Sequence, residues 1–527
     1  MIFALLFCFL PVFLYFYFTR TFDYWKKKNI KGPKPMVLFG NFKNVTLMRD
    51  LETFELKKIC NEYRNEPLVG VYRMTSPWLI VKDLDMIKHI LIKDFDYFSD
   101  RGVPVTDKKL NKNLFSSETE TWRVLRHQFT PLFTSGKLKN MLHLITERGD
   151  KFLDYVDEVT RTELDQELHV LIQLYTLSTI AACAFGLDVD LTTNNSFLSS
   201  LRDLDDLIFK RRSIQDIIIM YPNLFLKLGS LKFARNLNKF FEDLVATVIK
   251  QRNGKSINRH DFMDLILDLR SKGEISGPKR EDSKELTLEI TDDIIEAQAF
   301  VFYAAGYETS ATTMSFMLYE LARNPDIQEK LHQEIDEVLE STNGEVTYDT
   351  LSKLPYMEKV FDETLRVYPL VDPLQRRAKS EYRIPGTDVT IEKGQIVVVP
   401  VRAIHYDETI YPDPEKFDPE RFDPKLSAGR HACAYMPFGL GPRNCIGMCT
   451  HFIINQHIML TKSVVTVRFF ILDFAWSSNA ADDRVFLALG SIQTATRRVD
   501  AFINKYGFDR FARRLTLTTY SVKSIQI

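Results

Sequence analysis

A glycine-rich loop that carries a single cysteine constrains the fold of this chain more than any other stretch. The loop reads Phe438-Gly-Leu-Gly-Pro-Arg-Asn-Cys-Ile-Gly447. Its glycines allow positive φ angles and let the backbone approach a flat partner closely, which residues with a Cβ atom resist. Arg443 stands two residues before Cys445 and offers a rigid fork of donors to an acidic group. The loop therefore predicts a site for a flat, acidic molecule beside a cysteine.

Cys445 is a candidate ligand of haem iron. Backbone amides and the nearby Arg443 would favour its thiolate over its thiol, and a thiolate ligand pushes electron density onto haem iron and favours O–O cleavage. Two alternatives stay open from the loop alone. Cys445 could be a small buried residue in a turn, or it could bind zinc with the cysteines and histidines between His431 and His451. The spacing of those residues fits no usual zinc motif.

Length and composition limit the class of protein. The chain has 527 residues, of which 45% are hydrophobic and 26% charged, so it can bury one very large core or two ordinary ones. Its formal net charge is −1, which argues against a nucleic-acid partner. Six cysteines in a chain of this length do not form a disulfide framework, which indicates a reducing compartment.

The N-terminal segment predicts a membrane anchor. Residues Ile2 to Phe18 are apolar or aromatic without a charge, and Arg20 and several lysines come next. A helix of about 17 to 20 residues spans about 26 to 30 Å, enough for the hydrocarbon core. The basic flank should keep the rest of the chain on the cytosolic face. We assign residues 1–22 to the anchor and residues 23–36, which are rich in lysine and proline, to a hinge.

A cleaved signal peptide is the alternative for this segment. The chain lacks a basic region before the apolar run, and bulky residues stand where small ones should precede a cleavage site. Further along, Val69 to Arg73 and Trp78 to Val81 are short β-branched and aromatic runs that predict a hairpin. The chain after this hairpin mostly favours helix, and residues 270–289 are expected to form an exposed connector.

Two helical motifs could contact a bound molecule. Trp122 and Arg126 are four residues apart, so they share a helix face and could clamp an anion. The stretch from Asp292 to Arg323 predicts a long helix that contains Ala304-Ala-Gly-Tyr-Glu-Thr309. Gly306 would leave room on the face of Thr309, whose hydroxyl could meet a small molecule, and Glu308 could feed protons. The alternatives are an ordinary amphipathic helix and close helix packing at the glycine.

A charge pair is expected near the C-terminal loop. Glu363 and Arg366 are three residues apart on one helix, and Phe417-Asp-Pro-Glu-Arg-Phe422 supplies further charges. The spacing alone is weak, because Glu120 and Arg123 match it too. A buried network of charges is costly unless every member is paired, so we expect this one to fix a structural core.

Together these motifs resemble, in their order along the chain, the microsomal cytochrome P-450 family of haem-thiolate monooxygenases. The resemblance covers about residues 1–448. Three further phrases resemble the drug- and toxin-metabolising branch of animals, insects in particular: Phe98-Ser-Asp-Arg-Gly, Phe133-Thr-Ser-Gly-Lys and Ser315-Phe-Met-Leu-Tyr-Glu-Leu-Ala.

The resemblance implies roles for single residues. Cys445 would be the metal ligand, the proximal thiolate on the iron of haem b. Thr309, helped by Glu308, would steer protons to bound oxygen as the catalytic pair. Glu363, Arg366 and Arg421 would form a charge network beside the haem. The remaining cofactor-binding positions, which include the residues on the propionates and the porphyrin, would be Trp122, Arg126, Ala305, Arg376, Phe438, Gly441 and Arg443.

It also implies a fold and a reaction. The fold would be mainly α with a small β-rich lobe, in a single large monooxygenase domain (residues 37–448) behind an N-terminal membrane helix. The reaction would be NADPH-dependent monooxygenation of small apolar compounds, xenobiotics in particular, with molecular oxygen. Electrons would come from a membrane-bound flavoprotein reductase, with cytochrome b5 as a second expected partner. The protein would sit in the endoplasmic reticulum membrane with its catalytic domain on the cytosolic face.

The C-terminal tail, residues 449–527, departs from the family pattern. After Met448 the chain continues Cys449-Thr-His-Phe-Ile-Ile, and no proline occurs after Pro442. We interpret the tail as the product of a retained intron, an alternative exon or a frame shift, which sequencing of the transcript across the Met448 codon tests. A helix from Phe452 to Val467 and a strand are both open for it. Losing the family's usual helix would expose apolar surface beneath the haem.

Two other functions stay open. The tail could leave a haem-binding protein that is catalytically impaired. The chain could instead be a haem-thiolate isomerase that needs no reductase, although such relatives usually lack the threonine that Thr309 supplies.

Overall fold

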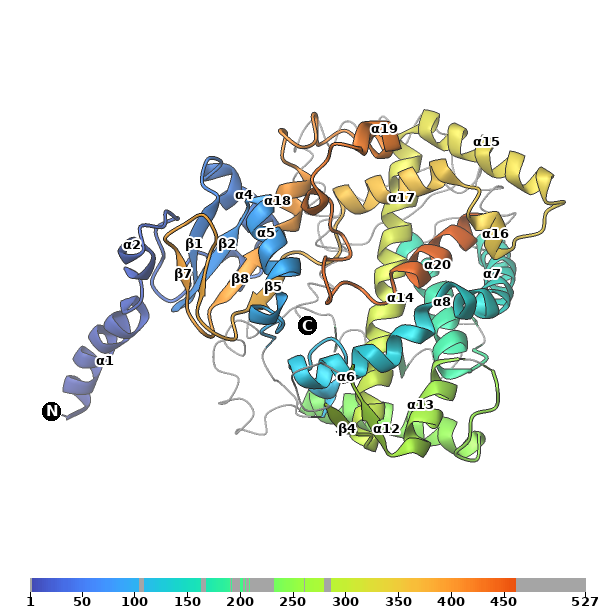
Figure 1. Ribbon diagram of the computed structural model, residues 1–527, viewed down its shortest axis with the longest axis horizontal. Helices are drawn as coiled ribbons and strands as arrows, with labels where there is room; N and C mark the ends of the chain where they lie inside the picture. The colour runs from blue at the N-terminus through green and yellow to red at the C-terminus, as the bar shows by residue number, and fades with distance from the viewer. Residues whose placement is uncertain are drawn as a thin grey trace.

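The computed structural model describes residues 2–460, apart from 104–108, 163–166, 190, 192–199, 202–203, 205–207, 209–231, 260 and 279–285. Most of the expected atypical tail, residues 461–527, therefore lies outside the described part. The molecule is mainly helical with a small β-rich lobe, as Figure 1 shows. This arrangement confirms the mainly helical fold with a small β-rich lobe, and the N-terminal membrane helix stays a prediction.

A four-stranded sheet forms the centre of the β-rich lobe. Its order is β1 (Leu68–Arg73), β2 (Ser76–Val81), β8 (Ile396–Val399) and β5 (Leu374–Arg377). The expected hairpin is confirmed, because β1 pairs antiparallel with β2, and Val71 lies opposite Trp78. Most β-branched residues of these strands are buried, as expected for a covered sheet. The sheet therefore joins segments more than 300 residues apart, since β8 runs parallel to β2.

Short helices and small strand pairs complete this lobe and its surroundings. The pair β6 (Tyr382–Arg383) and β7 (Thr390–Ile391) is antiparallel. The short helices are α3 (Lys43–Thr46), α4 (Glu52–Glu62), α5 (Leu84–Lys88), α18 (Val401–His405) and α19 (Pro424–Ser427). The expected exposed connector at 270–289 is wrong in part, because β3 (Glu274–Ser276) and β4 (Thr287–Glu289) pair there.

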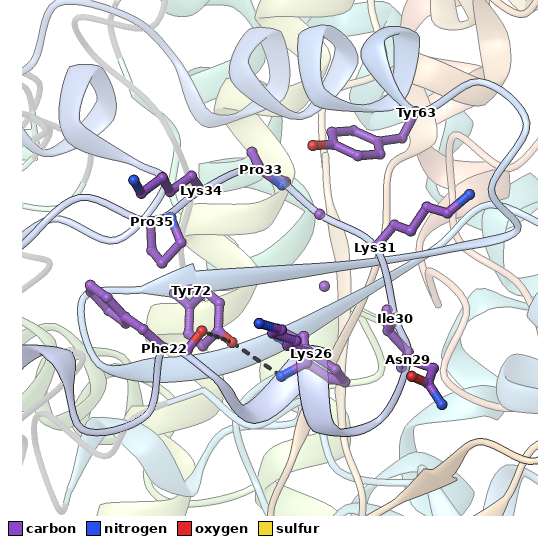
Figure 2. Close-up of a pocket in the computed structure, with 13 residues that line it drawn as sticks. Phe22, Lys26, Asn29, Ile30, Lys31, Pro33, Lys34, Pro35, Tyr63 and Tyr72 are labelled. Atoms are coloured by element: carbon purple, nitrogen blue, oxygen red, sulfur yellow. Dashed lines mark hydrogen bonds between the residues drawn. The ribbon is translucent and has the colours of Figure 1, made fainter.

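The N-terminal segment forms a helix and then packs on the sheet. The helix α1 (Ile2–Thr19) extends away from the β-rich lobe in Figure 1, and α2 (Tyr24–Lys27) comes after it. Trp25 is 3% exposed and belongs to the core around β1 and β2. Tyr72 accepts a hydrogen bond from the Trp25 backbone N–H at 3.1 Å (Figure 2). The expected hinge, residues 23–36, is thus held against the lobe.

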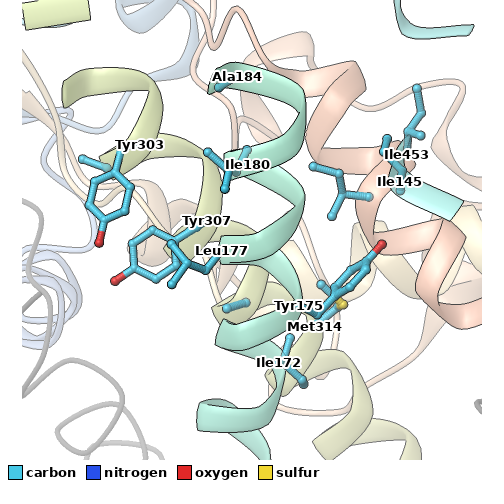
Figure 3. Packing of buried hydrophobic residues seen from close by; sticks show 14 of the residues in the cluster. Ile145, Ile172, Tyr175, Leu177, Ile180, Ala184, Tyr303, Tyr307, Met314 and Ile453 are labelled. Atoms are coloured by element: carbon cyan, nitrogen blue, oxygen red, sulfur yellow. The ribbon is translucent and has the colours of Figure 1, made fainter. Parts of the chain in front are cut away.

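The long helix α14 (Asp292–Arg323) runs through the helical part, with the bounds that the sequence predicted. Asp292 and Asp293 occupy its first turn, where negative charge favours the helix dipole. It packs along α8 (Leu168–Ile180), with Leu177 and Ile180 against Tyr303 and Tyr307 in Figure 3. The surrounding helices are α6 (Thr119–Phe129), α7 (Ser135–Thr162), α12 (Lys232–Gln251), α13 (Phe262–Lys272), α15 (Pro325–Ser341), α16 (Tyr348–Leu351) and α17 (Pro355–Val367).

One apolar stretch in the described part, Leu168–Phe185, is long enough to cross a membrane by length and composition. Most of it is buried inside the protein, and α8 packs against α14 and α7. Its apolar character is therefore accounted for by the core.

The chain after the cysteine loop forms the helix α20 (Met448–Leu460). Within the described residues this settles the choice between helix and strand in favour of helix. The helix packs against α14, α7 and α16. A helix therefore follows the cysteine loop, and it buries several polar residues, among them Asn455, Gln456 and His457.

Candidate haem site

The cysteine loop has the backbone that its glycines predict, with one difference. Gly439 and Gly441 adopt φ of 70° and 75°, whereas Gly447 does not have positive φ. A Cβ atom on Gly441 would lie 1.9 Å from the carbonyl oxygen of Leu91, in the π-helical turn η1 (His89–Lys93). The missing side chain at Gly441 therefore lets the loop pass close to the backbone of η1. The Cys445 backbone N–H donates to the Phe438 carbonyl at 2.9 Å and closes the loop.

The Cys445 side chain is exposed, but protein atoms surround it on most sides. These atoms displace water from around the thiol and raise its pKa above the usual value. The backbone N–H of Gly447 and the charges of Arg101 and Arg126 oppose this rise without overcoming it. The prediction that the surroundings alone favour the thiolate is therefore wrong. A bound metal ion would supply the missing stabilisation, because coordination deprotonates a thiol.

Four arginines gather around Cys445 and Trp122. Arg126 donates to the Asn444 carbonyl and side-chain oxygens, both at 2.8 Å. Arg443 donates to the Ser117 carbonyl at 2.8 Å, and its guanidinium lies 4.5 Å from the centre of the Trp122 ring. The sequence placed both arginines and the tryptophan in one site, and the structure brings them together.

Arg376 and Arg101 complete this arginine cluster. Arg376 comes from β5, is 2% exposed and donates to the Gln375 carbonyl at 2.8 Å. Arg101 donates to the Arg443 carbonyl at 2.9 Å. The sequence reasoning missed Arg101, because it stands in a loop phrase with no helical spacing to a partner. Its only signal was the phrase Phe98-Ser-Asp-Arg-Gly, which was used for the subgroup alone.

The arginine cluster has more positive charge than the described residues neutralise. The Nε atoms of Arg101, Arg376 and Arg443 are buried without a hydrogen-bond partner among those residues. Burial lowers the pKa of Arg376 to about 10. Burial, and then the charge of Arg376, lower the pKa of Arg443 to about 9. The nearest carboxylate oxygen, on Asp100, lies 3.9 Å from Arg443. Such a cluster fits a ligand with carboxylates, which haem provides through its two propionates.

Ala305 and Thr309 form the open face of α14. Ala305 is exposed and Thr309 is partly exposed, whereas most other side chains of this helix are buried. The Thr309 hydroxyl donates to the Ala305 carbonyl at 2.6 Å. The cysteine loop lies beside this helix, since His451, six residues after Cys445, contacts the hydroxyls of Ser310 and Thr313 at 3.2 and 3.1 Å. Ala305 and Thr309 therefore offer a small wall and a hydroxyl close to the loop.

Gly306 serves a different purpose from the one expected. A Cβ atom there would lie 2.5 Å from Cδ1 of Ile180 on α8. The missing side chain therefore lets two helices pack closely. This outcome corresponds to the packing alternative.

Glu308 lies on the α8 side of the same helix. It is 1% exposed. Its carboxylate accepts from Gln173 at 2.7 Å and Thr312 at 3.1 Å, and it lies 3.2 Å from Nε2 of His169. The carboxylate is thus engaged with α8, away from the open face of Ala305 and Thr309.

Phe438 and the charge network support the loop from the other side. Phe438 is partly buried and stacks with Phe361 of α17 at 6.5 Å between ring centres. The expected charge network is confirmed, with Glu363 and Arg366 paired at 2.7 Å and both fully buried. Arg421 lies 3.4 Å from Glu363. Arg366 also donates to the carbonyls of His405 and Pro414, at 2.8 and 2.9 Å, so the pair ties distant loops together.

Two further results concern the charge-pair spacing and the zinc alternative. Arg123 pairs with Asp96 and not with Glu120. The three-residue spacing that Glu120 and Arg123 share with Glu363 and Arg366 therefore does not by itself produce an ion pair. Across the described residues, no three His, Cys, Asp or Glu side chains gather in a way that could hold a metal ion. That result goes against a zinc site between His431 and His451.

Comparison with known proteins agrees with a haem site at Cys445. A family model described as Cytochrome P450 matches residues 30–449. Cytochrome P450 6B2 of Helicoverpa armigera is 50% identical over 439 residues, which cover 83% of this chain and 86% of that relative. Cytochrome P450 6B5 of Papilio glaucus is 52% identical over 436 residues, covering 82% and 91%. Probable cytochrome P450 6a14 of Drosophila melanogaster is 37% identical over 444 residues, covering 81% and 86%.

The family match ends one residue after Met448, where the tail departs from the family pattern. It includes every residue of the candidate site, from Arg101 to Cys445. Haem b, molecular oxygen and electrons derived from NADPH are the cofactors of this family. The match, the insect relatives and the accessible cysteine inside an arginine cluster agree that this chain belongs to the cytochrome P450 family.

Proposed function

We propose that this protein is a membrane-bound monooxygenase that uses electrons from NADPH to insert one oxygen atom into small apolar compounds, xenobiotics in particular. The observation that carries the proposal is the accessible Cys445 thiol next to four arginines with unmatched charge. This combination provides a metal ligand and an anion site together. A zinc site would need only the metal ligand, and a simple anion site would need only the arginines.

The residues divide the work of holding the cofactor. Bound haem would supply the oxygen activation that no side chain can provide. Cys445 would hold the iron, and Phe438 would cover the porphyrin close to the sulfur. Arg126, Arg376 and Arg443, with Trp122, would bind the propionates. Ala305 and Gly441 would contact the ring, although Gly441 also needs its missing side chain to pass Leu91.

Thr309 is the proposed proton donor. Its hydroxyl now donates to the Ala305 carbonyl, so its proton is held at a defined place on the open face of α14. A threonine can pass a proton on when a water molecule or oxygen species accepts from it. Glu308 would supply protons to Thr309 indirectly. Its carboxylate is buried between α8 and α14, where Gln173 and His169 contact it.

The proposed location is the endoplasmic reticulum membrane, with the catalytic domain on the cytosolic face. The apolar helix α1 and the lysines after it support this orientation. A membrane-bound flavoprotein reductase would deliver the electrons, with cytochrome b5 as a second donor.

The test is to measure NADPH consumption and product formation by the haem-loaded protein with a reductase. Thr309→Ala should consume NADPH but release much of the reduced oxygen as hydrogen peroxide, because the hydroxyl that directs protons is gone. A matched control is Thr247→Ala on α12, whose hydroxyl makes the same bond to a carbonyl four residues back. Unchanged coupling in Thr309→Ala would contradict the role of Thr309. Turnover without NADPH would favour the isomerase.

A haem-binding protein with impaired activity is the second candidate. The observation that favours it is α20, where His457 is 0% exposed and neither ring nitrogen has a partner among the described residues. Such burial destabilises the helix beneath the cysteine loop. Haem content after purification separates the two candidates: full loading with substrate turnover supports the monooxygenase, and full loading without turnover supports the impaired protein.

A further inference from the structure

A cavity of about 520 Å³ lies between the N-terminal segment and β1, outside the haem site. Figure 2 shows the aromatic rings of Phe22, Tyr63 and Tyr72 and the side chains of Lys26, Lys31 and Lys34 around it. The cavity begins three residues after α1 ends at Thr19. It is the place where the proposed membrane anchor meets the folded part of the chain.

Hydrogen bonds to the sheet fix the walls of this hinge cavity. The indole N–H of Trp25 donates to the Val71 carbonyl at 3.0 Å, and the Gly70 N–H donates to the Lys31 carbonyl at 2.9 Å. A Cβ atom on Gly32 would lie 1.9 Å from the Gly70 carbonyl oxygen, so the strand and the N-terminal segment are as close as backbone allows. The cavity is therefore preformed, which lowers the entropic cost of binding a ligand.

Charge in the hinge cavity has one sign. Three lysines line it, and none of its lining residues is acidic. Lys31 is paired with Glu66 at 2.5 Å, on the surface. Among the described residues, neither Lys26 nor Lys34 forms an ion pair within 4 Å. The cavity thus combines two available ammonium groups with an aromatic and proline wall, which suits an anion attached to an apolar body.

Exposed apolar side chains follow the hinge along the chain. Met36, Leu38, Leu47 and Met48 are 39% to 47% exposed. Leu38 and Met48 adopt positive φ, 74° and 57°, which is uncommon for large apolar residues. These exposed side chains are thus held in place at some cost in backbone strain. Apolar side chains beside lysines suit the boundary between acyl chains and headgroups.

We propose that the hinge cavity binds the phosphate of an acidic phospholipid, with Lys26 and Lys34 as its cationic ligands. Lys31 lies at the rim. The proposal rests on the proposed membrane anchor, since α1 is what brings the cavity to headgroup depth. A soluble phosphate compound shares the same chemistry, and the experiment distinguishes it from the lipid.

The first step of the test is flotation of the full-length haem-loaded protein with vesicles of phosphatidylcholine alone. Flotation supports the anchor. A protein that stays in the soluble fraction would overturn both the anchor and the lipid site. The second step places the protein in nanodiscs of phosphatidylcholine with a minor fraction of phosphatidic acid, and native mass spectrometry identifies the lipids that remain bound after release.

The wild-type protein should retain phosphatidic acid several-fold above its share in the nanodisc. The double variant Lys26→Gln/Lys34→Gln should lose this enrichment. The matched control is Lys272→Gln/Lys353→Gln, which removes the same charge at exposed positions of the helical part and should keep it. Equal enrichment in both double variants would overturn the site. Loss of the enrichment on adding glycerol phosphate at millimolar concentration would also overturn it, because a soluble phosphate would then be the ligand.

Discussion

At the residue scale, the arginine cluster is the clearest sign of a missing anionic partner. Buried cations normally have carboxylates beside them, because an unpaired buried charge is costly. Arg366 obeys this rule through Glu363, whereas Arg376 has no ion pair with any described residue. Buried arginines thus serve two purposes in this protein. Arg366, paired with Glu363, stabilises the fold, whereas Arg376 is available to bind an anionic ligand.

The substitution Arg376→Gln should weaken haem binding without weakening the fold. Loss of a charged hydrogen bond costs about 1.5 to 3 kcal/mol, which raises the dissociation constant of haem about 10- to 150-fold. The free energy of unfolding of protein prepared without haem should not fall, because the variant removes a buried cation that has no acidic partner. Haem transfer to an acceptor protein and chemical denaturation measure the two effects.

Arg383→Gln is the control for this prediction, since Arg383 pairs with Asp388 on the surface and should leave haem binding unchanged. Equal haem affinity in Arg376→Gln and the wild-type protein would show that Arg376 does not hold a propionate.

At the element scale, the pair on α17 ties this helix to the loops around His405, Pro414 and Asp418. Glu363→Gln should lower the free energy of unfolding by about 3 to 5 kcal/mol, because Arg366 is left as an uncompensated buried charge. Thermal and chemical denaturation measure the change. Asp388→Asn, at a 99% exposed carboxylate, is the control and should have little effect. A Glu363→Gln protein as stable as the wild type would mean that the network is not needed for the fold.

The helix α20 should be a weak and acid-sensitive element. Burial lowers the pKa of His457 to about 4 and that of His451 to about 3, from a usual value of 6.5. Both histidines are therefore neutral in the folded protein and bind protons more readily when unfolded. Their contribution to stability is complete above pH 6.5 and is lost as the pH falls towards about 4 for His457 and about 3 for His451. The loss is about 1.4 kcal/mol per pH unit for each proton.

His457→Leu should raise the free energy of unfolding at pH 7 by about 1 to 3 kcal/mol, since two unpartnered ring nitrogens disappear from the core. It should also reduce the acid sensitivity. Asp362 and Asp372, whose pKa values burial raises to about 7 and about 6, act in the opposite direction, so the difference between variant and wild type is the quantity to compare. His143→Leu on α7 is an exposed control. Equal pH profiles would show that His457 is solvated.

At the scale of the whole molecule, the candidate site joins segments that the chain keeps far apart. Arg376 comes from the β-rich lobe, Trp122 and Arg126 from α6, Thr309 from α14 and Cys445 from the loop before α20. A ligand that contacts all of them stabilises every segment together, because it binds the folded chain and not the unfolded one. Haem should therefore be a structural partner of both parts of the molecule as well as the cofactor.

The order of motifs predicted this arrangement better than any single motif did. Periodicity located α14 and the β1–β2 hairpin, and the order of short motifs brought Trp122, Arg126, Arg376 and Arg443 into one site. Faces and partners were harder to predict. Gly306 faces Ile180, and Glu308 faces α8, because neighbouring helices decide which side of a helix is buried. Arg101 had no spacing signal, since the carbonyl to which it donates, on Arg443, lies more than 300 residues away.

The tail shows a second limit of sequence reasoning. The family match ends at residue 449, close to the point where the sequence predicted a departure from the family pattern. The chain nevertheless forms a helix to Leu460, against α14 and α7. Apolar residues such as Ile453, Ile454 and Ile458 are buried there. These residues account for the packing of α20. His457 is buried in the same helix without a hydrogen-bond partner among the described residues, which lowers the stability of the fold.

The central claim is that Cys445 binds the iron of haem inside the arginine cluster. The most direct measurement is the absorption spectrum of the purified, reduced protein after exposure to carbon monoxide, compared with that of Cys445→Ala. The account predicts the Soret band position of thiolate-ligated haem for the wild type, and its loss in Cys445→Ala. Cys449→Ala, which removes the other exposed thiol nearby, should keep the band. An unchanged band in Cys445→Ala, or a wild-type protein that takes up no haem, would contradict the account.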